Sequence, residues 1–550
     1  MKRILGMLVV ALAVGLAATA CGGKSSSSGS GGSGSVTISN EQGATWTCGF
    51  NPFNGNVNFL SMGPVYEVLT FVNGLKSGAS TNWLASSYAW SNGNKTLTFT
   101  IRNGVKWTDG KPLTAADVLY TFNLIKKDPA LDLNASWSVL KSVRQQGNKV
   151  IFDFKTSAVP YFYYIADQTP IVPQHIWSKI SNPVTYKDEK PVGSGPFQMS
   201  SCSPQVIKYT KNANYWQKGL PKLKTVYYPA FTSNDPANQQ LASGEAQWGS
   251  QFIPNINSFY LNKSPNHHYW FPPISNVSLF INLQDPILKD VAVRKAMAYA
   301  IDRHKVSEIG EYGYEPPSNQ TGIVTPTFNS WLDPKLASQV GYDPQKAVKT
   351  LEAAGYKKKG DLFYTPSGKP LSFTIINIGG YSDWVASVQV IQQELKAVGI
   401  KITPENLSST TYDADTYAGK FQLDYNGNES GGPAPYYELR QLLYSKNSAP
   451  IGKSASSNWE RYSNPATDKL IDDYAATADP AKQHEIIRQL EKVMVDEVPV
   501  IPVTEGVDWY QYNTEKLSGW VTQGDPYAQP AAYVTPDWGV VLLHLKPKGS

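Results

Sequence analysis

The chain has 550 residues, enough for roughly three to four structural units of average size. With 41% hydrophobic and 17% charged residues, the composition is that of a folded globular protein and excludes disorder for most of the chain. The formal charge of +5 comes from dispersed residues, which argues against a nucleic-acid partner.

The first 20 residues have the order of a secretory signal: basic Lys2 and Arg3, then an apolar run from Ile4 to Ala20. The run is short for a membrane-spanning helix, so we interpret residues 1–20 as a signal peptide. The junction at Cys21 resembles a bacterial lipobox, which implies cleavage before Cys21 and lipid attachment to its thiol. Residues 21–35 are almost wholly Ser and Gly after this cysteine and are expected to form a flexible tether.

Cys48 and Cys202 are the other two cysteines. In an exported protein they are compatible with one disulfide, which we favour, or with two separate buried thiols.

Strands and helices alternate along the body. The alternation of apolar and polar residues predicts strands at 97–101 and 150–154. Between these two strands, Thr114 and Asp117 predict the capped start of a helix. Further on, Asp343, Pro344 and Gly355 have the cap chemistry of a helix start and stop. Amphipathic helices are also expected around Val293 to Ile301, over 382–399 before a strand at 400–402, and around Ile486 to Met494 before a buried strand at 498–503.

No catalytic motif emerges. The chain lacks a P-loop, a His-Glu-x-x-His helix and a Gly-x-Ser-x-Gly elbow, and His267-His268 are adjacent rather than on one face. We therefore expect no enzyme activity, no cofactor and no metal. A secreted, lipid-anchored hydrolase is the less favoured alternative.

Several segments together resemble the family 5 extracytoplasmic solute-binding proteins of ABC importers. Ile101 to Val118 carries the family signature, and Gly193 to Phe197, Asp290 to Arg303, Gly341 to Pro344 and Glu497 to Pro502 follow in the family's order. The resemblance implies an α/β, two-lobed periplasmic-binding-protein-like fold (type II, cluster C-like), with an extra domain inserted in the first lobe. By analogy, lobe I takes 36–66, 193–275 and 505–550, the inserted domain 67–192, and lobe II 276–504.

The same resemblance implies a monomer, lipid-anchored outside the cytoplasm, that binds a solute in the cleft between lobes and delivers it to a membrane permease. Oligopeptides are the first choice of cargo, and cello-, xylo- or manno-oligosaccharides are the alternative. Glu429 is the nearest match to the acid that pairs with a peptide's ammonium group in the family. Trp46, the Asn-Pro-Phe-Asn run at 51–54 and Trp384 resemble a sugar-binding lining. The complete set of expected ligand contacts is Trp46, Phe59, Trp384, Tyr425, Asn428, Glu429 and Tyr436.

Overall fold

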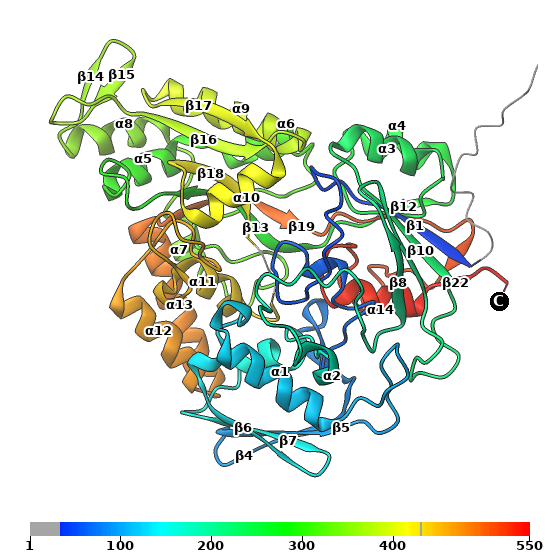
Figure 1. Ribbon diagram of the computed structural model, residues 1–550. Coiled ribbons are helices and arrows are strands. Elements are labelled where there is room, and N and C mark those ends of the chain that lie inside the picture. The colour runs from blue at the N-terminus through cyan, green and yellow to red at the C-terminus, as the bar shows by residue number, and fades with distance from the viewer. Residues whose placement is uncertain (1–33, 429–431, 550) are drawn as a thin grey trace, which may run out of the picture. The chain divides into compact units, whose positions relative to one another are not determined.

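Two β-sheets organise the computed structural model of the protein, which describes residues 34–428 and 432–549 (Figure 1). The seven-stranded sheet has the order β12 (His267–Tyr269), β20 (Gln511–Asn513), β11 (Trp248–Gly249), β1 (Ser35–Ser39), β10 (Thr225–Pro229), β9 (Val206–Lys211), β8 (Phe197–Cys202). The five-stranded sheet has the order β17 (Lys401–Leu407), β16 (Ser372–Ile378), β18 (Leu423–Gly427), β13 (Pro273–Ile281), β19 (Val500–Val507). We call the elements around the first sheet lobe I and those around the second lobe II.

The chain passes between the two sheets twice. It leaves lobe I through residues 270–272, between β12 and β13, and returns through residues 508–510, between β19 and β20. Because β13 and β19 pair side by side, the chain enters and leaves lobe II through neighbouring strands. This arrangement confirms the predicted two-lobed α/β fold; the numerical domain limits given above stay a prediction.

A four-stranded antiparallel sheet lies in the chain between β1 and β8. Its order is β4 (Ala85–Ser91), β5 (Thr96–Ile101), β7 (Lys149–Phe154), β6 (Leu140–Gln146). The predicted strands are confirmed as β5 and β7, and they pair with Leu97 opposite Phe152 and Phe99 opposite Val150. Three two-stranded antiparallel pairs join β2 (Thr70–Asn73) with β3 (Ala79–Asn82), β14 (Lys357–Lys359) with β15 (Leu362–Tyr364), and, across the segment that holds α14, β21 (Leu517–Ser518) with β22 (Lys546–Pro547).

The predicted helix starts are also confirmed. Helix α1 (Ala115–Lys127) begins with the capping box of Thr114 and Asp117. Helix α8 (Pro344–Ala353) is capped by Asp343, whose carboxylate accepts from the Lys346 amide, and Gly355 follows it with a φ of +87°. The other helices are α2 (Gln174–Trp177), α3 (Asn234–Ala242), α4 (Ile256–Phe259), α5 (Val291–Ala300), α6 (Arg303–Gly310), α7 (Pro334–Ala337), α9 (Ser382–Ala397), α10 (Ser409–Ala418), α11 (Pro435–Leu443), α12 (Pro465–Ala476), α13 (Pro480–Glu497) and α14 (Asp537–His544).

Among the described residues, no helix is both long and apolar enough to cross a membrane. The predicted signal peptide, the lipidated Cys21 and most of the tether lie outside the described residues. So does Glu429.

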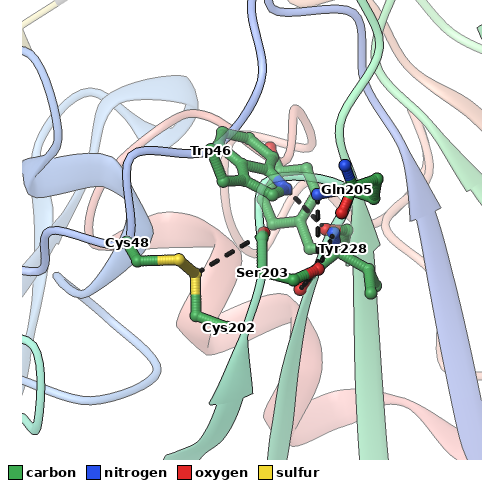
Figure 2. The surroundings of a disulfide bond; sticks show 7 residues. Trp46, Cys48, Cys202, Ser203, Gln205 and Tyr228 are labelled. Atoms are coloured by element: carbon green, nitrogen blue, oxygen red, sulfur yellow. Dashed lines mark hydrogen bonds between the residues drawn. A yellow bond between two sulfur atoms is a disulfide. The ribbon is translucent and has the colours of Figure 1, made fainter.

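A disulfide ties the loop after β1 to the end of β8 (Figure 2). The sulfur atoms of Cys48 and Cys202 lie 2.06 Å apart and the Cα atoms 5.7 Å apart, across 154 residues of sequence. Beside the disulfide, the Trp46 indole donates to the Tyr228 carbonyl oxygen over 2.8 Å. The structure thus has the disulfide rather than two separate thiols. The disulfide fixes a loop of lobe I that leads into the cavity between the lobes.

Candidate functional site

A cavity of about 910 Å³ is lined by residues of both lobes and of the segment between β1 and β8. This volume lies near the upper end of the range of roughly 300–1,000 Å³ that is typical of small-molecule sites. Lobe I contributes the loops that follow β1 and β11 and the chain around Trp509. Lobe II contributes the first turn of α9 and the end of β18. A ligand of several linked units therefore fits between the lobes and touches both.

Aromatic rings provide much of the wall, and those that keep part of their surface accessible can stack on a ligand. The half-buried rings that line the cavity are Phe59, Tyr381, Trp384, Tyr417, Trp509 and Tyr533. Trp384 is held edge-on by Tyr381 and Tyr425, with ring centroids 5.2 and 5.7 Å away. Trp509 packs in the same T-shaped manner on Phe252, at 5.5 Å. Both tryptophan rings are therefore fixed before a ligand arrives.

Side-chain amides form the second large group in the wall. They are Asn40, Gln42, Asn54, Asn56, Asn58, Asn134, Gln168, Asn234, Gln251, Asn428, Gln441, Asn447 and Gln529. Each amide offers both donors and an acceptor without carrying charge. The wall can thus form many hydrogen bonds with an uncharged polar ligand.

Arg440 is the one basic residue that the described part of the chain places in the wall. It is buried, and its guanidinium lies 5.1–5.5 Å from the ring centroids of Tyr161, Tyr164 and Tyr444. Its Nη2 donates to the Tyr161 hydroxyl over 3.1 Å. These cation–π and hydrogen-bonding contacts engage the cation within the protein.

Three buried carboxyl groups, Glu41, Glu315 and Asp383, also line the cavity. Burial raises the pKa of Glu41 to about 8, and the nearby Asp383 adds to the rise. Burial likewise raises the pKa of Asp383 and of Glu315, and Asp383 contributes to the shift at Glu315. Burial raises the pKa of the neighbouring Glu311, and the charges of Glu315 and Asp383 add to the rise. Near neutral pH such groups retain protons and can act as hydrogen-bond donors.

The four buried acids Glu41, Glu311, Glu315 and Asp383 make the free energy of unfolding depend on pH. The folded protein holds protons that the unfolded chain releases above its ordinary carboxyl pKa of about 4.5, so the free energy of unfolding should fall as pH rises from about 4.5 to about 8. We expect a higher melting temperature at about pH 5.5 than at about pH 8.5 by calorimetry. The double variant Glu41→Gln/Asp383→Asn should lose part of this dependence, whereas Glu245→Gln, at an exposed position, should keep it. Equal pH dependence in all three proteins would contradict the assignment.

The structure brings three of the expected ligand contacts to the cavity wall: Phe59, Trp384 and Asn428. It places three others in the protein interior. Trp46 is hydrogen-bonded to Tyr228, Tyr425 lies on the central strand β18, and Tyr436 stacks on Tyr474 with centroids 4.3 Å apart. None of these three side chains lines the cavity. Glu429 lies outside the described residues.

Four further aromatic residues of the wall were not predicted as ligand contacts from the sequence: Tyr381, Tyr417, Trp509 and Tyr533. Trp509 has a recognisable position in retrospect, because it sits in the crossing that follows the buried strand β19. No group of three or more His, Cys, Asp or Glu residues within the described ranges is arranged to hold a metal ion.

Comparison with known proteins identifies the family. The model of the bacterial extracellular solute-binding proteins, family 5 (middle region), matches residues 80–450. The chain belongs to this family. Family 5 proteins are the solute-binding components of ABC importers, and the relatives are extracytoplasmic binding proteins rather than enzymes.

Individual relatives cover most of the chain. The oligopeptide-binding protein AppA of Bacillus subtilis is 27% identical over 79% of this chain and 81% of its own. A mannohexaose-bound periplasmic oligopeptide-binding protein of an oligopeptide ABC transporter from Thermotoga maritima superposes with a TM-score of 0.87, at 27% identity, over 94% of this chain and 99% of its own. The structure of B. subtilis AppA with a nonapeptide gives a TM-score of 0.78 at 22% identity over 93% and 98%, which shows the shared fold.

Proposed function

We propose that this family 5 protein captures oligosaccharides in the interlobe cavity and delivers them to an ABC permease. The composition of the cavity wall carries the proposal. Thirteen neutral amides line the wall and can bind hydroxyl groups with the donors and acceptors that their bonds within the protein leave over. Half-buried rings such as Trp384 and Trp509 can stack on the C–H faces of sugar rings.

The charges of the wall support an uncharged cargo. A peptide brings an ammonium and a carboxylate that each need a partner. Arg440 is already engaged by tyrosines. The pKa values of the four acids of the wall, Glu41, Asp132, Glu315 and Asp383, are raised by burial, which favours their neutral forms, and Asp132 already accepts the Ser136 and Trp137 amides. The likeness to the mannohexaose-bound protein of T. maritima points in the same direction.

Oligopeptides are the second candidate, favoured by the names of relatives such as B. subtilis AppA. The resemblance to peptide binders assigns Glu429 to the ammonium group. For a peptide cargo, Glu429→Gln should weaken binding by roughly 2–5 kcal/mol, because a desolvated charge loses its partner.

Isothermal titration calorimetry against manno-, cello- and xylo-oligosaccharides and against a peptide pool tests the cargo. We expect binding in the sugar series with a negative heat-capacity change, and no binding of peptides. Binding confined to peptides, and weakened by Glu429→Gln, would replace the first candidate by the second.

We also propose that lipid on Cys21 anchors the protein, as a monomer, to the outer side of the cell membrane. The basic start, apolar run and Ser/Gly stretch of the sequence support this anchor. Cys21→Ser should abolish labelling by a lipid precursor and release the protein from the membrane fraction; retention of the variant on membranes would argue against the anchor.

A further inference from the structure

Helix α9 of lobe II begins without a cap of its own. Its N-cap residue, Tyr381, makes no side-chain hydrogen bond to the first turn. The first backbone N–H groups of a helix have no partner within the helix and need one from elsewhere. In this helix they lie at the cavity wall, since Tyr381, Asp383 and Trp384 all line it.

The partner of the first of these amides, that of Ser382, comes from lobe I. The side-chain oxygen of Asn234, at the start of α3, accepts the Ser382 amide over 3.0 Å and the Ser382 hydroxyl over 3.4 Å. Helix α3 packs on β1 of the seven-stranded sheet, whereas α9 packs on β16 and β17 of the five-stranded sheet. Asn234 is buried at 4% exposure and itself lines the cavity. One lobe thus caps a helix of the other.

A close backbone approach lies beside this cap. A Cβ placed on Gly380 would come within 2.7 Å of the Thr232 carbonyl oxygen, two residues before Asn234. Only glycine allows the segment before α9 to lie this close to the loop before α3. A second approach joins the same lobes at Gly43, where an added Cβ would lie 2.9 Å from the Ser409 Cβ.

We propose that Asn234 is a closure latch, a positioning residue that caps helix α9 only when the lobes meet. Separation of the lobes removes the cap and leaves the Ser382 amide to water. Trp384 lies two residues further along the same helix, so the latch connects lobe closure to the helix that carries this ring. The inference rests on the proposed capture role, but it does not depend on which cargo is bound.

The latch can be tested without ligand. Spin labels on Lys222→Cys in lobe I and Lys358→Cys in lobe II, both exposed positions, report the separation of the lobes in a Cys21→Ser background. We expect Asn234→Ala to shift the pulsed-EPR distance distribution toward longer separations. Gly380→Ala should shift it in the same direction through a steric clash that exists only when the lobes meet.

Ligand release provides the second measurement. With mannohexaose as the probe, Asn234→Ala should raise the dissociation constant roughly 2- to 30-fold, the equivalent of one helix cap, mainly through faster dissociation. If mannohexaose fails to bind the parent protein, the proposed cargo fails while the ligand-free distances still decide on the latch.

Asn464→Ala is the matched control. Asn464 caps α12 within lobe II by accepting the Ala466 amide over 3.0 Å, so its loss should lower the melting temperature and leave the lobe distances unchanged. Gly341→Ala, where an added Cβ meets nothing within 4 Å, controls for the glycine substitution. Parent-like distances in both Asn234→Ala and Gly380→Ala would overturn the proposal, as would a shift of equal size in Asn464→Ala.

Discussion

Replacing Trp384 by Ala should weaken oligosaccharide binding by about 2–4 kcal/mol, the range of a central aromatic contact in a binding site. The ring is half-buried in the cavity wall and is supported edge-on by Tyr381, Tyr412 and Tyr425, with centroids 5.2–6.3 Å away. Because these contacts hold the ring in place, a sugar that stacks on it incurs little further loss of side-chain entropy. Calorimetric titration of parent and variant with the same oligosaccharide measures the difference.

Trp331→Ala is the control for this experiment. Trp331 is also half-buried in the lobe II part of the chain, but it stacks on His484 at 3.9 Å and does not line the cavity. Its loss should change the melting temperature and leave the affinity unaltered. Equal affinities of the Trp384→Ala variant and the parent would remove this ring from the ligand site and weaken the sugar proposal with it.

Local structure was predictable because its signals are local. The caps of α1 and α8 depend on side chains within three residues of the amides that they satisfy, such as Thr114 and Asp343. Amphipathic spacing located α9, and alternation located β5. The resemblance of whole segments to family 5 supplied the two lobes, which no local pattern shows.

The cavity wall was harder to predict, because residues from Asn40 to Thr535 meet there only through the sheet topology. Aromatic residues show the difficulty best. Tyr425 and Trp384 look alike in the sequence, yet Tyr425 lies on β18, between β16 and β13, and is fully buried. Trp509 faces the cavity because β19 ends just before it. The same kind of side chain serves as core or as ligand platform according to where its strand or helix ends.

The cap of α9 could not be predicted from the sequence for the same reason. Nothing near Ser382 in the sequence provides the acceptor; it comes from Asn234, 148 residues earlier. A helix start that lacks a local cap is visible in the sequence, but its remote partner is visible only in the fold.

Glu67→Ala should lower the free energy of unfolding by about 3–5 kcal/mol, because the Glu67 carboxyl group accepts hydrogen bonds from four side chains. The Trp83 indole and the Ser194 hydroxyl donate to it over 2.8 Å each, Tyr215 over 3.0 Å and the Trp216 indole over 3.1 Å. Ser194 and Tyr215 are buried, and a buried donor without an acceptor costs about 1–3 kcal/mol. Trp83 precedes the four-stranded sheet in the sequence, whereas Ser194, Tyr215 and Trp216 follow it. Glu67 therefore joins the segment that forms this sheet to lobe I.

Glu67→Gln distinguishes this network from a simple loss of volume. The side-chain oxygen of the glutamine can accept from Trp83, Tyr215 and Trp216. The side-chain NH₂ can donate to the Ser194 hydroxyl, because a hydroxyl oxygen can act as an acceptor as well as a donor. Burial raises the pKa of Glu67 to about 7, so a neutral side chain is tolerated at this position near neutral pH. We therefore expect Glu67→Gln to lose less than half of the stability that Glu67→Ala loses, as measured by urea unfolding at about pH 6. Equal losses in the two variants would show that the hydrogen bonds contribute little. A Glu67→Ala protein as stable as the parent would show that Glu67 does not join the segment of the four-stranded sheet to lobe I.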